Sequence, residues 1–164
     1  MNKRIVAPLA AAMMALAGTA GAAEKTTTFQ VSAVVTTNCV ISADAMDLGT
    51  FDGSNTLTAA SDITVSCTNG TPYSVNLSTG GSGDYAAREL TDGVSTLVYN
   101  LYTSNTYGTV WGDGSGATGR LGGTGGGMAT VDTLTVHGRL RAADNTGAID
   151  AGTYTDTITA TVVY

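Results

Sequence analysis

Residues 157–164 read Thr-Ile-Thr-Ala-Thr-Val-Val-Tyr, and they show the clearest two-residue alternation in the sequence. Successive side chains of a β-strand point to opposite faces of the sheet, so alternation of apolar and polar residues predicts a half-buried strand. Threonine fills one face over residues 157–161, and β-branched residues favour a pleated, partly buried surface. The predicted inward face consists of Ile158, Ala160, Val162 and Tyr164.

The same period recurs along the chain, whereas long segments of helical period are absent. Residues 84–91 are the only stretch compatible with a short helix, and the glycine-rich residues 112–127 are expected to form a loop. Short alternating strands predict one all-β domain, an antiparallel β-sandwich, because strands of a parallel sheet read as continuous apolar runs. The expected strands are residues 29–35, 63–67, 73–77, 97–101 and 134–140, with weaker candidates at 40–41, 46–48 and 110–111.

Residues 1–22 have the features of a secretory signal peptide. Lys3 and Arg4 precede an apolar run over residues 5–17, and small residues follow it. This pattern predicts cleavage after Ala22 or Ala23, and the apolar run is short for a membrane span. We therefore expect export to the periplasm and a soluble mature chain.

The charge of the chain argues against several partners. Its net charge is −6, and removal of residues 1–22 leaves five basic residues against 13 acidic ones. An acidic protein without a basic cluster is a poor candidate for binding nucleic acid or an anionic membrane. We expect neither partner.

Cys39 and Cys67 are the only cysteines. An even pair in an exported protein predicts one disulfide, which the loop-entropy model values at about 3.5 kcal/mol. A zinc site needs more ligands, and His137 is the only histidine. We expect no metal and no cofactor.

Enzymatic motifs are weak in this sequence. Residues 114–119 formally match the dinucleotide-binding glycine pattern, but a glycine-rich stretch follows them where that pattern requires a helix. His137 lies in a strand pattern on the side opposite the apolar residues, so we expect an exposed or edge-strand histidine and no enzyme. Four aromatic residues could stack on sugars, although their pattern fits the core better. They are Tyr99, Tyr102, Tyr107 and Trp111.

The two ends of the chain differ in a way that bears on assembly. Residues 23–36 begin with a polar lead and continue as an alternating segment, while the last strand continues to the final residue. One interpretation is that the sandwich lacks a strand beside the C-terminal one, and that a neighbouring copy supplies it by strand addition. The other interpretation is that the segment folds back as the domain's own first strand. The pattern leaves both open. The inward residues of this segment are Phe29, Val31, Ala33 and Val35.

Several motifs resemble one known family. They are Val-Tyr-Asn-Leu-Tyr-Thr at residues 98–103, Val-Trp-Gly-Asp-Gly at 110–114, Ala-Gly-Thr-Tyr-Thr-Asp-Thr-Ile at 151–158, and Thr-Thr-Asn-Cys at 36–39. Together they resemble the spore coat protein U domain family, which includes pilin subunits of archaic chaperone–usher pili. The resemblance covers essentially the whole mature chain.

The resemblance implies an incomplete immunoglobulin-like antiparallel β-sandwich over residues 37–164, completed by a donor strand. Residues 23–36 would be the donor extension, and the partners would be other copies or related pilin subunits, a periplasmic chaperone and the outer-membrane usher. The implied function is a surface pilus subunit in adhesion and biofilm formation. An envelope or spore-coat structural protein and a glycan-binding tip adhesin are the alternatives.

The resemblance also assigns roles to residues. Donor residues would be Phe29, Val31, Ala33 and Val35, although Ala33 is smaller than a donor position leads one to expect. Asp156 falls on the apolar side of the last strand, where we expect it to be hydrogen-bonded or exposed. The acceptor groove and chaperone contact would involve Ile158, Ala160, Val162 and Tyr164.

Overall fold

The computed structural model describes residues 21–164, so most of the predicted signal peptide lies outside the described residues. Residues 21–34 belong to one unit, which contains no strand where it is described, and residues 35–164 form a second, compact unit. Within residues 21–164 no helix is long and apolar enough to cross a membrane.

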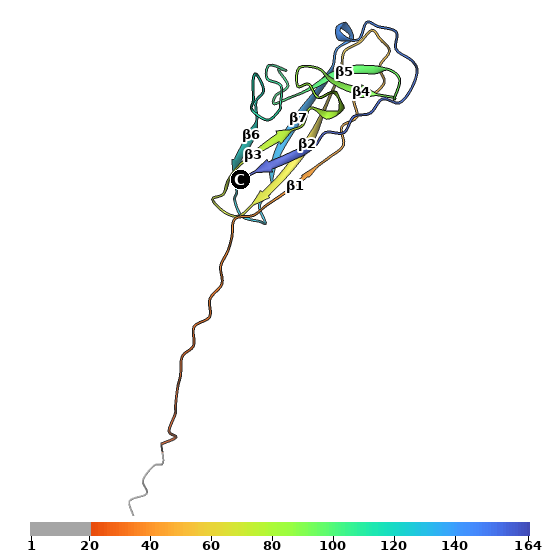
Figure 1. Cartoon of the computed structure of the whole chain (residues 1–164). Coiled ribbons are helices and arrows are strands. Elements are labelled where there is room, and N and C mark those ends of the chain that lie inside the picture. Colours follow the sequence, from red (N-terminus) through yellow and green to blue (C-terminus); the bar gives the residue numbers. More distant parts are fainter. Residues whose placement is uncertain (1–20) are drawn as a thin grey trace, which may run out of the picture. The chain divides into compact units, whose positions relative to one another are not determined.

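The second unit contains eight strands in two antiparallel sheets (Figure 1). The five-stranded sheet has the order β1-β2-β7-β5-β4, and the three-stranded sheet has the order β6-β3-β8. The predicted all-β antiparallel fold is therefore confirmed. The strands are β1 (Cys39–Ala43), β2 (Leu57–Cys67), β3 (Pro72–Leu77), β4 (Arg88–Thr91), β5 (Thr96–Tyr102), β6 (Leu121–Thr124), β7 (Asp132–Leu140) and β8 (Ala160–Val163).

The hydrophobic core lies between the sheets and follows the predicted alternation. Strands β2, β3, β5 and β7 bury alternate side chains over much of their length. The residues between them are more exposed, except for Asn100 of β5, which is also buried. Trp111, from the loop after β5, is completely buried, and its Nε1 donates a hydrogen bond to the carbonyl oxygen of Val75 at 2.8 Å. The buried strand residues are Ile63, Val65, Cys67, Tyr73, Val75, Leu77, Leu97, Tyr99, Leu101, Val136 and Leu140.

The structure resolves one ambiguous stretch and shows that one local prediction is wrong. Residues 88–91 form strand β4 rather than part of a helix, because they pair with residues 96–99 of β5 in a hairpin. The glycine-rich residues 112–127 contain strand β6, which pairs with β3. A side chain at Gly122 would collide with the carbonyl oxygen of Tyr73, so glycine allows the two backbones to approach.

Arg88 is a fully buried charge that the sequence did not reveal. Its guanidinium donates hydrogen bonds to the carbonyl oxygens of Ser78 (2.7 and 3.0 Å) and Trp111 (2.7 Å), and to Oδ1 of Asn100 (2.7 Å). A buried charge is tolerated only when its hydrogen bonds are satisfied. Arg88 therefore fixes the end of β3 and the Trp111 loop against the β4–β5 hairpin.

A buried tyrosine links the two sheets. The hydroxyl of Tyr73 on β3 donates a hydrogen bond to Asp132 at the start of β7, at 2.9 Å. Burial of the ring and then the adjacent carboxylate raise the pKa of Tyr73 to about 12. A phenol with a raised pKa stabilises the fold below its unfolded pKa, and that contribution disappears as pH rises through the folded pKa.

We therefore expect the free energy of unfolding to be steady from pH 8 to 10 and to fall between pH 10 and about 12. Urea denaturation at a series of pH values measures this dependence. Tyr73→Phe should reduce the slope, and Tyr99 should supply the remainder because its pKa is also raised. An unchanged slope in Tyr73→Phe would contradict this assignment.

Candidate assembly groove

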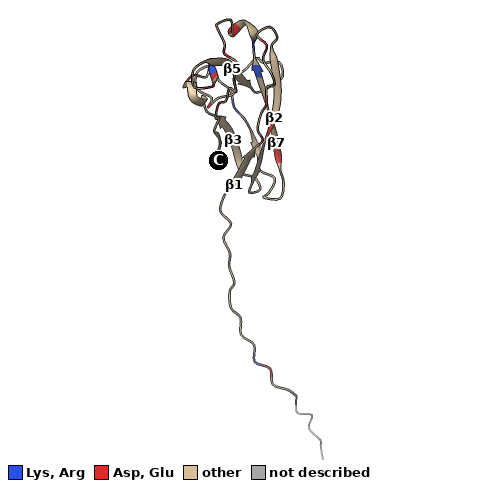
Figure 2. Ribbon diagram, turned by 90° about the vertical axis from the view of Figure 1, so that its right-hand side faces the viewer, with Lys and Arg blue, Asp and Glu red and all other residues tan. Residues whose placement is uncertain are grey.

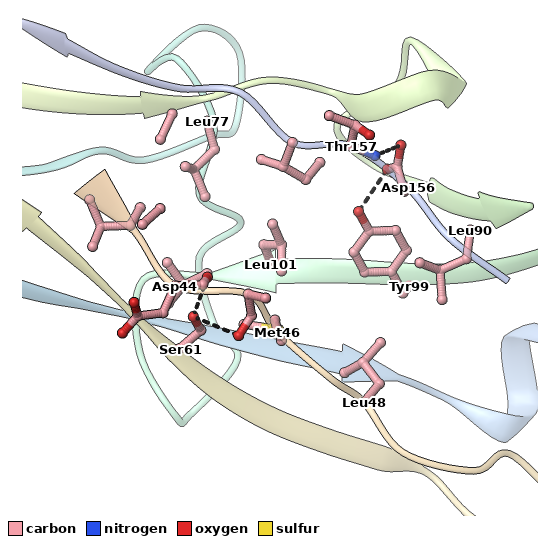
Figure 3. Close-up of a pocket in the computed structure, with 16 residues that line it drawn as sticks. Asp44, Met46, Leu48, Ser61, Leu77, Leu90, Tyr99, Leu101, Asp156 and Thr157 are labelled. Atoms are coloured by element: carbon pink, nitrogen blue, oxygen red, sulfur yellow. Dashed lines mark hydrogen bonds between the residues drawn. The ribbon is translucent and has the colours of Figure 1, made fainter. Parts of the chain in front are cut away.

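An apolar groove opens the core along one side of the sandwich. Its walls are residues 43–51, which follow β1, and residues 149–160, which lead into β8. Two cavities of about 370 and 470 Å³ make up the groove, and they share Met46, Leu48 and Leu90. Figure 3 shows the first cavity, with Leu77 and Leu101 between the two walls.

The floor of the groove is the core itself. Ile63, Leu77, Leu101 and Val136 line the first cavity, and Leu57, Leu97 and Leu140 line the second. Most of these side chains are inward-facing residues of the predicted strands. A contiguous apolar surface of this kind indicates an interaction site.

Both strands beside the groove are edge strands. Strand β8 pairs only with β3, and β1 pairs only with β2. Ser78 N donates a hydrogen bond to Thr159 O at 2.9 Å, so the odd-numbered residues of β8 direct their backbone groups towards β3. Because these groups alternate sides in an antiparallel strand, those of Ile158, Ala160 and Val162 point towards the free edge.

The β1 edge has the same property. Thr68 N donates a hydrogen bond to Asn38 O at 2.9 Å, and Asp44 N donates to Asp62 O at 3.0 Å. The even-numbered residues of this strand are therefore turned towards β2, and Cys39, Ile41 and Ala43 are turned towards the free edge. Two edges with unpaired backbone groups thus flank an apolar groove, which is the arrangement that favours strand addition.

The four predicted acceptor residues lie in or beside strand β8, and two of them line the groove. Ile158, Ala160 and Val162 face inward and are partly buried, and Ile158 and Ala160 line the first cavity. Tyr164 is 56% exposed. Strand β8 is shorter than the predicted strand, because Ile158 and Tyr164 lie just outside its ends.

The predicted donor residues lie in a segment without secondary structure. Residues 29–35 contain no strand, so the strand predicted there is absent from this single chain. Phe29, Val31 and Val35 are more than 80% exposed, and Ala33 is exposed as well.

The predicted disulfide is formed between Cys39 and Cys67. The two cysteines are directly paired in the β1–β2 register, and Cys67 is buried in the core. The cross-link holds the start of β1 at the edge of the five-stranded sheet. It therefore fixes one wall of the groove near its end.

Asp156 is a polar residue in the opposite wall. Its carboxylate accepts hydrogen bonds from the hydroxyl of Tyr99 and from Thr157 N, both at 2.7 Å (Figure 3). It also accepts one from Gly81 N at 2.9 Å. Burial of the ring and then the bond to Asp156 raise the pKa of Tyr99. Asp156 is hydrogen-bonded, as expected, and it anchors the wall to β5 and to the turn at Gly80–Ser82.

Comparison with known proteins agrees with this architecture. The family model of the Spore Coat Protein U domain matches residues 25–161. The chain belongs to the Spore Coat Protein U domain family. No curated protein matches the sequence.

A solved structure similar to this Spore Coat Protein U domain comes from Acinetobacter baumannii. It is the complex of CsuC and CsuE, a chaperone and a tip adhesion subunit before assembly, from archaic chaperone–usher Csu pili. The TM-score is 0.57 at 24% identity, so the likeness concerns the fold. The match covers 79% of this chain but 40% of the other.

The remaining candidate residues of the domain lie outside the groove or in the core. Trp111 is completely buried and Tyr99 is 6% exposed, so Trp111 is a core residue rather than a surface for stacking on sugars. Tyr102 and Tyr107 contact the guanidinium of Arg139, which lies 5.1 and 4.4 Å from their ring centroids.

His137 and residues 114–119 do not line the groove. His137 is partly buried on β7, an interior strand, so the expectation of an exposed or edge-strand histidine is wrong. No helix follows the glycine pattern at residues 114–119. Within residues 21–164 no group of three or more His, Cys, Asp or Glu side chains is placed to hold a metal ion. Charged residues are scattered over the domain rather than gathered in a basic cluster (Figure 2).

The hydrogen bond between Tyr99 and Asp156 generates a prediction. Tyr99→Phe removes the hydroxyl group, so the partly buried carboxylate of Asp156 loses one of its hydrogen-bond donors. We expect the free energy of unfolding to fall by about 1.5–3 kcal/mol. Tyr154→Phe is the matched control, because its hydroxyl bonds to an exposed carbonyl oxygen of Asp150. Chemical denaturation of both variants tests this, and equal losses would contradict it.

Proposed function

We propose that this chain is a structural subunit of a chaperone–usher surface pilus and that it polymerises by donor-strand exchange. In this reaction residues 23–36 of one copy occupy the groove of the next. The observation that carries the proposal is the apolar groove between residues 43–51 and residues 149–160, which adjoin the edge strands β1 and β8. The exposed alternating side chains of residues 29–35 supply the matching strand.

The energetics favour such an exchange. Phe29, Val31 and Val35 are almost fully exposed, and burial of a side chain of this size contributes about 1.5–3 kcal/mol. Backbone hydrogen bonds to both free edges would fix the direction and register of the inserted strand. Since each copy gives one strand and receives one, the contact is head-to-tail and produces a fibre.

An open core also explains the need for a chaperone. Before assembly the groove exposes apolar surface beside unpaired strand edges, which promotes aggregation. A periplasmic chaperone would cover this surface until an outer-membrane usher passes the subunit to the growing fibre. The family membership and the fold shared with the chaperone-bound Csu complex support this route.

The remaining parts of the proposal concern the route and the role. Residues 1–22 would direct export and be removed, residues 23–36 would be the donor extension, and residues 37–164 would be the pilin domain. The assembled pilus would lie at the cell surface and support adhesion and biofilm formation.

Strand exchange predicts oligomers that are not covalent but are kinetically stable. We expect the purified mature chain to give a ladder in SDS without boiling and a single band after boiling. Deletion of residues 23–35 should abolish the ladder, as should Val31→Asp, because a buried unpaired charge opposes insertion. Val34→Asp is the control, since Val34 lies on the other side of the donor segment, and its ladder should persist. A ladder formed by the deletion variant would exclude the mechanism.

A further inference from the structure

The chain from residue 154 through strand β8 has an uneven profile of inward-facing side chains. Along it lie Tyr154, Asp156, Ile158, Ala160 and Val162, which are in turn large, charged, large, small and intermediate. The inward residues of the donor segment are also uneven, since Phe29 is the largest and Ala33 the smallest. Two uneven profiles fit each other best in one register.

Asp156 restricts what can lie opposite it. Its three hydrogen-bond donors are neutral groups, and within residues 21–164 the one salt bridge joins Arg141 to Asp144. A large apolar side chain packed on this carboxylate would remove it further from water without a new hydrogen bond, which is unfavourable. The residue opposite Asp156 should therefore be small.

The pairing pattern limits the registers that can form. Every strand pair in both sheets of the domain is antiparallel, so we take the inserted strand as antiparallel to β8. Directly opposed residues place their side chains on the same face, so the odd-numbered donor residues lie opposite the even-numbered wall residues. Alternative registers then differ by steps of two residues.

We propose that Ala33 of one copy lies opposite Asp156 of the next, and that this pair sets the register of the inserted strand. This inference rests on the proposed strand exchange. In this register Phe29 lies opposite Ala160, the smallest of these inward-facing residues, and Val31 lies opposite Ile158 above the first cavity. A shift by two residues in one direction places Val35 on the carboxylate, and a shift in the other direction places Val31 there. The small size of Ala33, unexpected in a donor strand, follows from this pairing.

Cysteine cross-linking distinguishes the registers. Three double variants of the full mature chain each combine Ile158→Cys with one substitution in the donor segment, and the native disulfide is left in place. The donor substitutions are Val31→Cys, Ala33→Cys and Phe29→Cys. Opposed residues of a hydrogen-bonded antiparallel pair have Cα atoms about 5.5 Å apart, within disulfide range, whereas a shift of two residues places them beyond about 7 Å. After oxidation and boiling without reductant, we expect covalent oligomers from the Val31→Cys pair alone.

The outcomes separate the two proposals. A ladder in unboiled samples with efficient cross-linking through residue 29 or 33 overturns the register and leaves strand exchange intact. The absence of both the ladder and any cross-link in all three pairs refutes strand exchange, and the register with it.

A second experiment tests the role of the carboxylate. Ala33→Leu should speed dissociation of the ladder in SDS about tenfold, whereas Val34→Leu, on the other side of the donor segment, should leave the rate unchanged. Asp156→Asn removes the charge, and its amide oxygen can still accept the bond from Gly81 N while its amide nitrogen donates to the hydroxyl oxygen of Tyr99. In this background the effect of Ala33→Leu should shrink to about threefold or less. Equal effects of Ala33→Leu in both backgrounds would exclude Asp156 as the determinant of the register.

Discussion

The free backbone edge of β8 beside an unfinished part of the core is the constraint on which the rest of this structure depends. Strand β8 has one partner, β3, and the groove next to it exposes side chains that belong to the interior of both sheets. Within residues 35–164, no strand pairs with the free backbone groups of this edge, and no segment covers the apolar surface beside it. The same feature therefore makes the domain an acceptor for a further strand and makes its core accessible before that strand arrives.

Such a groove must resist collapse, and polar groups at its margins serve this purpose. Asp156 binds Tyr99 and Gly81, so the wall before β8 is fixed to β5 and to the turn after β3. The Cys39–Cys67 disulfide fixes the start of the other wall. Arg88 ties the end of β3 to the β4–β5 hairpin through bonds to carbonyl oxygens. Local anchors of this kind keep two walls apart without a strand between them.

Much of the fold could be predicted from two-residue alternation, because the central strands have one buried and one exposed face. Strands with Ile63, Val75, Leu101 and Val136 were found on this basis. The pattern failed where burial is not signalled by apolar residues. Strand β4 buries Arg88, and β6 consists mainly of glycine and threonine residues that allow close approach to β3.

The site could be predicted only in part. Alternation identified the wall residues Ile158 and Ala160, because both belong to the alternating segment at residues 157–164. It did not identify the opposite wall beyond a weak signal at residues 46–48, since that wall is irregular and its inward residues are unevenly spaced. Nor could it identify the bond between Tyr99 and Asp156, which joins residues 57 positions apart and depends on how the sheets pack.

Amide hydrogen exchange along β8 tests the free edge most directly. Thr161 and Val163 direct their amides towards β3, while Ala160 and Val162 direct theirs towards the free edge, so the monomer should show slow and fast exchange at alternate residues. In SDS-resistant oligomers all four amides should exchange slowly, because the inserted strand accepts the second set of bonds. Slow exchange of Ala160 and Val162 in the monomer, or fast exchange of both in the oligomers, would contradict an open edge that is completed by assembly.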